Sequence, residues 1–253
     1  MAKTALITGA SAGKFPIKCR TRIGRSTAIA LSAAGWNVIL TGRRQDALEE
    51  SSIRCSNLTL VVAGEITNEK FVEELFSLAV ERFGTFPMFN AGISSAQTPI
   101  ENLSLDTFQQ VLNVNLVGPF LCTREAVRIF KTQSPPGGRI INNGSLAAHV
   151  PRPHSFPYAC SKHAISGLTK CTALDGRAYN ITCTQIDIGN AHTDMAAGHT
   201  VGALQPDGRV VPEATFDVQH VADTIVHIAS LPNDVAMLEV NIMAAGAPYV
   251  GRG

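Results

Sequence analysis

Three side chains in the middle of the chain have the types and spacing of a proton-transfer site. Tyr158 and Lys162 stand four residues apart in YACSK, so on a helix they share one face. A lysine ammonium beside a phenol favours the phenolate and lowers the tyrosine pKa from about 10, which makes the group usable near neutral pH. Ser145 stands thirteen residues earlier, in INNGS. Its hydroxyl can hydrogen-bond a substrate oxygen as charge develops there.

A second candidate site is the glycine-rich stretch TGASAG at 8–13, which follows a short apolar run. Glycines let backbone N–H groups approach a pyrophosphate, and a helix that begins just after them supplies positive potential. Here KFPIKCRTR, residues 14–22, separates the glycines from the helical pattern IGRSTAIAL. The stretch therefore predicts an interrupted dinucleotide-binding turn, with contact residues Gly9, Ser11, Gly13, Ile23 and Gly24.

The end of the second predicted strand, LTGRR, bears on which dinucleotide would bind. An acidic residue at this position hydrogen-bonds the ribose 2′-hydroxyl of NAD, whereas an arginine accommodates the 2′-phosphate of NADP. The position holds Gly42 and Arg43 and no acid. This favours NADP(H), with NAD(H) as the other possibility. The alternative is that Arg43 belongs to an ordinary solvated basic turn.

Two asparagine motifs follow. NAG, residues 90–92, comes after the fourth predicted strand, and Asn115 lies in NVNLVG inside a long helical pattern. Asparagine and glycine are both poor helix formers, so Asn115 and Gly118 indicate a kink or a functional role. A packing reason for Gly118 is the alternative.

The elements that must position these residues alternate along the chain. Predicted strands lie at 4–7, 37–41, 58–63, 86–92, 137–145, 181–189 and 237–244, and predicted helices at 23–34, 43–53, 68–84, 105–130, 158–178 and 217–230. Strands that are apolar throughout are typical of a parallel sheet covered on both faces. The order predicts a doubly wound α/β fold in one domain over residues 1–253. Residues 190–216 form a long connection, read as a binding loop or else as disorder.

Composition excludes several classes of function. Lys+Arg 21 against Asp+Glu 20 leaves a formal net charge of +1, which argues against nucleic acid as a partner. No apolar run is long enough to span a membrane, and no signal peptide is expected. The six cysteines are scattered, which is typical of reduced thiols in a cytoplasmic protein. No metal site is predicted, and the histidines, His149 among them, are read as surface or packed residues.

Together, TGASAG…IG, NAG, NVN, INNGS, YACSK and QIDIGNAHT resemble the short-chain dehydrogenase/reductase family over essentially the whole chain. The resemblance implies a Rossmann-type domain with a mostly parallel seven-stranded sheet. It also implies hydride transfer between a nicotinamide and a small carbonyl or alcohol, by a homodimer or homotetramer. Relatives pair through two long helices, and the small residues Ala159, Ala164, Ser166 and Gly167 would permit close packing there or would face the sheet.

The resemblance also implies roles for individual residues. Tyr158 would be the general acid/base, Lys162 would lower its pKa and bind the nicotinamide ribose, and Ser145 would polarise the substrate oxygen. Asn115 would hold a water in a proton relay to Lys162. The remaining implied cofactor contacts are Glu65 and Ile66 after the third strand, Asn90, Ala91 and Gly92 after the fourth, and Ile188 and Thr193 after the sixth.

The chain departs from the family pattern at three places: the insertion at 14–22, a shortened fourth strand that contains Pro87, and Asp187-Ile188 where Pro-Gly is usual. Deleting residues 14–22 restores TGASAGIGRSTAIAL, so one interpretation is translated non-coding sequence. Another treats the basic residues there, together with Arg25, as extra contacts for NADP. The alternative function is a non-catalytic dinucleotide-binding or scaffold protein whose cofactor site is impaired.

Overall fold

The computed structural model describes residues 3–11, 23–84, 88–90, 97–193 and 202–250. A seven-stranded sheet has the order β3-β2-β1-β4-β5-β6-β9, and every pairing in it is parallel. Its strands are β1 (Thr4–Thr8), β2 (Asn37–Gly42), β3 (Thr59–Ala63), β4 (Met88–Asn90), β5 (Gly138–Asn143), β6 (Ile181–Ile188) and β9 (Glu239–Ile242). The doubly wound α/β architecture expected from the sequence is confirmed.

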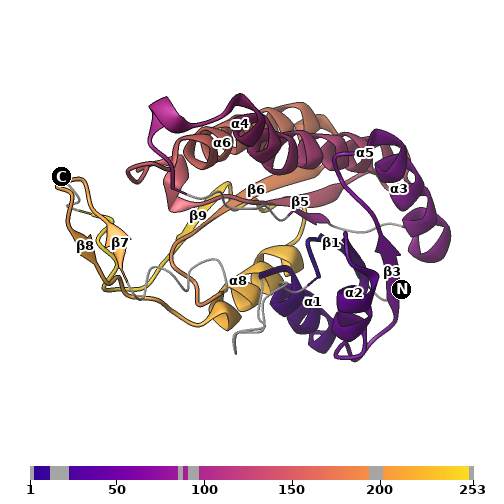
Figure 1. The fold of residues 1–253 in the computed structure, drawn as a ribbon. Coiled ribbons are helices and arrows are strands. Elements are labelled where there is room, and N and C mark those ends of the chain that lie inside the picture. Colours follow the sequence, from indigo (N-terminus) through magenta and orange to yellow (C-terminus); the bar gives the residue numbers. More distant parts are fainter. Residues whose placement is uncertain (1–2, 12–22, 85–87, 91–96, 194–201, 251–253) are drawn as a thin grey trace.

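Helices cover both faces of this sheet (Figure 1). On one face lie α1 (Ile23–Ala33), α2 (Gln45–Ser52) and α8 (Val218–Ser230), which contribute Leu31, Leu48 and Ile225 to one apolar core. On the other lie α3 (Glu69–Phe83), α5 (Gly118–Thr132) and α6 (Phe156–Gly176), with α4 (Leu105–Leu112) against α6. Burial on both faces explains why the strands are apolar throughout rather than alternating.

The strand order places a topological switch between β1 and β4. From β1 the chain proceeds outward through β2 and β3, then returns to the other side of β1 with β4. In open parallel sheets, ligands bind in the crevice outside the carboxyl ends of the strands at such a point. The turn at Gly9, the backbone of Asn90 and the segment that begins at Ser145 all follow strand ends at this edge.

Two predicted segments differ in form from the expectation. The long helix predicted over 105–130 is divided into α4, a π-helical turn at Asn113–Val117, and α5. The connection at 190–216 contains a small antiparallel hairpin of β7 (Ala203–Leu204) and β8 (Val210–Val211), whose strands are too short to give a clear sequence pattern. β4 has three residues, and Pro87 lies outside the described part of the chain. Among the described helices, none is both long and apolar enough to cross a membrane.

Candidate active site

Ser145, Tyr158 and Lys162 come together at the carboxyl end of β5. Ser145 caps a 3-10 turn at Leu146–Ala148 just beyond this strand, and its hydroxyl hydrogen-bonds the Tyr158 phenol. Tyr158 and Lys162 lie one turn apart on α6, and the Lys162 ammonium is 5.4 Å from the centroid of the Tyr158 ring. The Lys162 side chain is 1% exposed and donates to the carbonyl oxygen of Asn143 over 2.7 Å. The structure therefore brings the three predicted residues together, and their shared role in catalysis stays a prediction.

Burial is the largest cause of the pKa shifts in this group. The sequence predicts that Lys162 lowers the pKa of Tyr158, and that contribution stays a prediction. Burial raises the Tyr158 pKa, the Ser145 hydrogen bond lowers it, and the charge of Asp187 raises it again, so the net direction is upward. Burial also lowers the pKa of Lys162 to about 8, although the charge of Asp187 opposes this change. Tyr158 therefore keeps its proton through neutral pH.

Asn115 lies in the π-helical turn and is 1% exposed. Its side-chain amide donates to the Ser161 hydroxyl over 3.0 Å, and that hydroxyl donates to the carbonyl oxygen of Tyr158 over 2.7 Å. Asn115 thus fastens the turn to α6 between Tyr158 and Lys162. Single π-helical turns are frequent at functional sites. The proposed water relay from Asn115 to Lys162 stays a prediction.

Gly118 has a packing explanation. A Cβ atom on Gly118 would lie 2.8 Å from Cγ1 of Ile66, so a larger residue here would force the Ile66 side chain to move. Of the two interpretations of Gly118 offered by the sequence, packing is the one that the structure supports. It also places Ile66, a predicted cofactor contact, against the start of α5.

The two described ends of the glycine-rich turn are in direct contact despite the insertion between them. Gly9 adopts φ +66°, a left-handed conformation that favours glycine. A Cβ atom on Gly24 would lie 2.6 Å from the carbonyl oxygen of Gly9, so the helix begins against the turn. The first turn of α1 carries no acidic residue that would repel a phosphate. Gly13 and residues 14–22 lie outside the described residues.

The end of β2 is also closely packed. A Cβ atom on Gly42 would lie 2.9 Å from the Ser11 hydroxyl, and Ser11 is buried. Arg43 is exposed, and its guanidinium lies 3.9 Å from the carboxylate of Glu65, which is exposed as well. An exposed pair at this distance contributes little stability, so Arg43 remains available to an anion.

Arg25 does not serve as an extra contact for NADP. It is 1% exposed and points toward α2, where Nε donates to the Ser51 hydroxyl over 2.8 Å. A terminal guanidinium nitrogen donates to the carbonyl oxygen of Ala47 and to the Glu50 carboxylate. The interpretation that grouped Arg25 with the basic residues of the insertion is therefore wrong on this point.

The remaining predicted cofactor contacts follow β4 and β6. Ile188 ends β6 and Thr193 follows it, and both are buried. Asn90 ends β4 in register with Asn142 of β5, which places its backbone at the same edge of the sheet. Ala91 and Gly92 lie outside the described residues. The fit of this chain to a dinucleotide therefore rests on the glycine contacts, Arg43 and the ends of β4 and β6.

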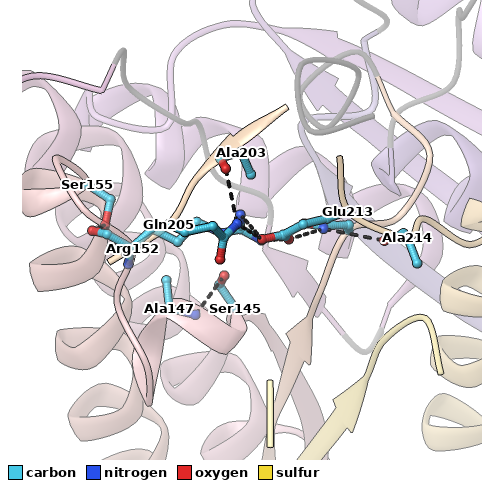
Figure 2. A network of polar contacts seen from close by, with 9 residues as sticks. Ser145, Ala147, Arg152, Ser155, Ala203, Gln205, Glu213 and Ala214 are labelled. Carbon is cyan, nitrogen blue, oxygen red and sulfur yellow. Dashed lines mark hydrogen bonds and ion pairs between the residues drawn. The ribbon is translucent and has the colours of Figure 1, made fainter. Parts of the chain in front are cut away.

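A polar network that the sequence did not predict fastens the β7–β8 hairpin beside the site. Arg152 donates to the carboxylate of Glu213 with two nitrogens and to the side-chain oxygen of Asn190. Asn190 and Gln205 donate to the same carboxylate over 2.8 and 3.0 Å. Figure 2 shows Arg152, Gln205 and Glu213 converging, and it also draws Ser145 with its hydrogen bond from Ala147. The contacts of Arg152, Gln205 and Glu213 join segments that are far apart in the sequence, so no local sequence pattern predicts them.

A second feature that the sequence missed is a buried carboxylate behind Ser145. Asp187 is 0% exposed, and one of its oxygens accepts from the backbone N–H of Ser145 over 2.8 Å. The other lies 2.8 Å from Nε2 of His149. The one sequence feature that pointed to Asp187 was the unusual DIG where the family usually has Pro-Gly. Nothing in the sequence indicated that His149 contacts this carboxylate, because His149 is expected there to be a surface or packed residue.

The comparisons with known proteins agree with this geometry. Residues 3–201 match the family described as short chain dehydrogenase. The chain belongs to the short-chain dehydrogenase/reductase family. Members of this family are oxidoreductases, and the order and identity of the sequence motifs agree with that assignment.

Two curated relatives and one solved structure illustrate the similarity. A 3β-hydroxysteroid dehydrogenase of Mediterraneibacter gnavus is 34% identical over 73% of this chain and 64% of its own length. A 3-oxoacyl-[acyl-carrier-protein] reductase of Synechocystis is 29% identical over 91% of this chain and 90% of its own. The structure of a 3-ketoacyl-(acyl-carrier-protein) reductase from Brucella melitensis, complexed with NADH, has a TM-score of 0.82 and 22% identity, with 96% of this chain and 97% of that one covered.

Proposed function

We propose that this protein is an NADP(H)-dependent oxidoreductase that transfers a hydride between the nicotinamide and a small carbonyl or alcohol. The observation that carries the proposal is the Ser145–Tyr158–Lys162 group at the carboxyl edge of the sheet, together with a glycine turn whose two ends are still in contact. Ser145 and Lys162 are buried, and Tyr158 is partly exposed. The cofactor, when bound, supplies the hydride donor or acceptor. Orientation of the substrate and transfer of the proton depend on side chains of this protein.

Each of the three residues has a distinct task. The Ser145 hydroxyl, already hydrogen-bonded to Tyr158, orients the substrate oxygen next to the phenol. Tyr158 donates its proton to that oxygen as a carbonyl is reduced, and it accepts the proton back when an alcohol is oxidised. The Lys162 ammonium, held by the carbonyl of Asn143, would support negative charge on the phenol oxygen and would bind a ribose hydroxyl of the cofactor.

Turnover tests these roles. We expect wild-type protein to consume NADPH in the presence of a panel of small aldehydes and ketones. Tyr158→Phe should abolish this consumption and leave NADPH binding nearly unchanged, because the ring is retained and only the proton donor is lost. Turnover by Tyr158→Phe would remove Tyr158 from its role. Binding without turnover in wild type would favour the alternative of a non-catalytic dinucleotide-binding protein.

The preference for NADP(H) rests on Arg43. Its exposed guanidinium follows β2 where a ribose 2′-phosphate would be recognised, and no acid occupies the position. We expect Arg43→Ala to weaken NADPH binding by about 10- to 100-fold and NADH binding much less, since a charge-assisted hydrogen bond contributes about 1.5–3 kcal/mol. Arg54→Ala removes the same charge from another exposed position and is the control. Equal loss of both nucleotides in Arg43→Ala would contradict the assignment.

We also propose that the protein is a homodimer or homotetramer. Exposed apolar side chains support this: Phe120 on α5 is 47% exposed and Leu174 on α6 is 62% exposed. The small residues of α6 divide between the two expected roles. Ser166 faces the sheet, where its hydroxyl accepts from Gln185, whereas Gly167 is exposed, with open space where a Cβ would lie. Light scattering on the purified protein would give the oligomeric state, and a monomer would contradict the proposal. A cytoplasmic location stays a prediction.

A further inference from the structure

Asp187 is placed unusually for a charged residue. Its side chain is 0% exposed on β6, a strand paired on both sides, and a buried carboxylate is costly unless hydrogen bonds and opposite charges compensate it. Here the compensation is extensive. One oxygen accepts from the backbone N–H of Ser145, the other contacts Nε2 of His149, and the Gln185 amide lies within hydrogen-bond distance of both oxygens.

The Asp187 carboxylate packs closely against the backbone of Gly144. A Cβ atom on Gly144 would lie 2.0 Å from the Asp187 carboxylate oxygen, so the glycine before Ser145 is needed by this carboxylate. The contact joins the end of β6 to the start of the segment that carries Ser145. The position of the Ser145 hydroxyl therefore depends on Asp187 directly, through one backbone hydrogen bond and one close contact.

We propose that Asp187 is a positioning residue of this active site, whose buried carboxylate fixes the Ser145 backbone and the His149 ring and adds a negative charge beside the Tyr158–Lys162 pair. The inference rests on the proposed function, because it concerns the proton that Tyr158 transfers. Among the described residues, the titratable side chains that face Asp187 are Tyr158 and Lys162 from α6 and His149 from the segment after Ser145. Through this charge, Asp187 acts on both members of the proton-transfer pair.

The sign of the electrostatic effect follows from the charges. A negative carboxylate disfavours a phenolate and favours an ammonium, so Asp187 raises the pKa of Tyr158 and that of Lys162. Both groups consequently keep their protons to higher pH than they would without it. Tyr158 then remains a phenol, the form that donates a proton to a carbonyl, and the enzyme is suited to reduction over neutral and mildly alkaline pH.

The test separates charge from shape. Asp187→Asn keeps an oxygen that can accept from Ser145 and removes the charge, so we expect the alkaline decline of kcat/KM for carbonyl reduction to move to lower pH. Asp187→Ser is smaller and neutral and should move it in the same direction. The control is Asp175→Asn, which removes one charge from an exposed position on α6 and should leave the profile unchanged.

Asp187→Ala tests the positioning of Ser145, because it removes the oxygen that accepts from the Ser145 backbone N–H. We expect kcat to fall by about a hundredfold with little change in KM for NADPH.

A second measurement does not depend on turnover. The absorbance of the phenolate reports tyrosine ionisation, and the chain has three tyrosines. Subtracting the titration of the matching Tyr158→Phe variant isolates Tyr158 in wild type and in Asp187→Asn. We expect a lower Tyr158 pKa in Asp187→Asn. Coincident titration curves, or a higher pKa in the variant, would overturn the inference, whereas absent turnover in wild type would count against the proposed function alone.

Discussion

The carboxylate of Glu213 should make the free energy of unfolding depend strongly on pH in the acidic range. Glu213 is 6% exposed and follows β8 by two residues. Burial alone would raise its pKa, but hydrogen bonds from Arg152, Gln205 and Asn190 together outweigh burial and lower the pKa from 4.5 to about 2. The folded protein therefore holds this carboxylate in its charged form far more strongly than the unfolded chain does.

The size and sign of the effect follow from linkage. A folded-state pKa of about 2 against 4.5 in the unfolded chain corresponds to about 3 kcal/mol, at about 1.4 kcal/mol per pH unit. Because the folded pKa is the lower one, this stability is fully present above about pH 4.5. It is lost as the pH falls from there toward 2. Glu213→Gln removes the charge at every pH and leaves Arg152 with an unpaired charge, so we expect a loss of about 3 kcal/mol at neutral pH.

Urea unfolding measures this directly. The free energies of unfolding of wild type and Glu213→Gln should differ by about 3 kcal/mol near pH 7, and the difference should shrink as the pH falls below about 4.5. Asp207→Asn is the matched control, because Asp207 pairs with Arg209 on the same hairpin but its side chain is 49% exposed. Its unfolding should match that of wild type. A Glu213→Gln protein as stable as wild type near pH 7, or a difference that does not change on acidification, would refute the reasoning.

Three glycine substitutions provide further tests, each measured by thermal or urea unfolding. Gly24→Ala should destabilise the protein by about 1–3 kcal/mol and weaken NADPH binding, because its Cβ would lie 2.6 Å from the backbone oxygen of Gly9. Gly118→Ala should destabilise through Ile66, and adding Ile66→Ala should recover part of the loss; no recovery would contradict the packing explanation. Gly167→Ala should instead stabilise the protein by about 0.5–1 kcal/mol, since it lies inside α6 with open space around it, and a loss of stability would count against that placement.

Much of the architecture was readable from the sequence because it depends on local patterns. Apolar strands such as TALIT, and helices such as α3 that end at glycine, follow from periodicity and termination signals. Ser145, Tyr158 and Lys162 could be grouped because a hydroxyl after a buried strand and an i, i+4 pair on a helix have few geometric alternatives. For the π-helical turn at Asn115 the sequence predicted only a kink, because one extra residue in a single turn does not change the apolar periodicity enough to be recognised.

The contacts that the sequence did not reveal join distant segments. Arg152, Asn190 and Glu213 are brought together only when the hairpin folds over the loop after Ser145, and nothing in their local sequences indicates it. The net direction of the Tyr158 pKa could not be predicted from the sequence for a similar reason. The expectation considered Lys162 on the same helix, whereas burial and the charge of Asp187 on β6 determine the direction.

We expect the nucleotide site to work despite the insertion at 14–22. The most direct measurement is a fluorescence titration with NADPH and NADH of wild type and of a variant that lacks residues 14–22. Because Gly9 and Gly24 are in contact, we expect wild type to bind NADPH saturably, with an affinity within about tenfold of that of the deletion variant, and to bind NADH more weakly. Binding by the deletion variant with none by wild type would show that the insertion closes the site and would contradict this expectation.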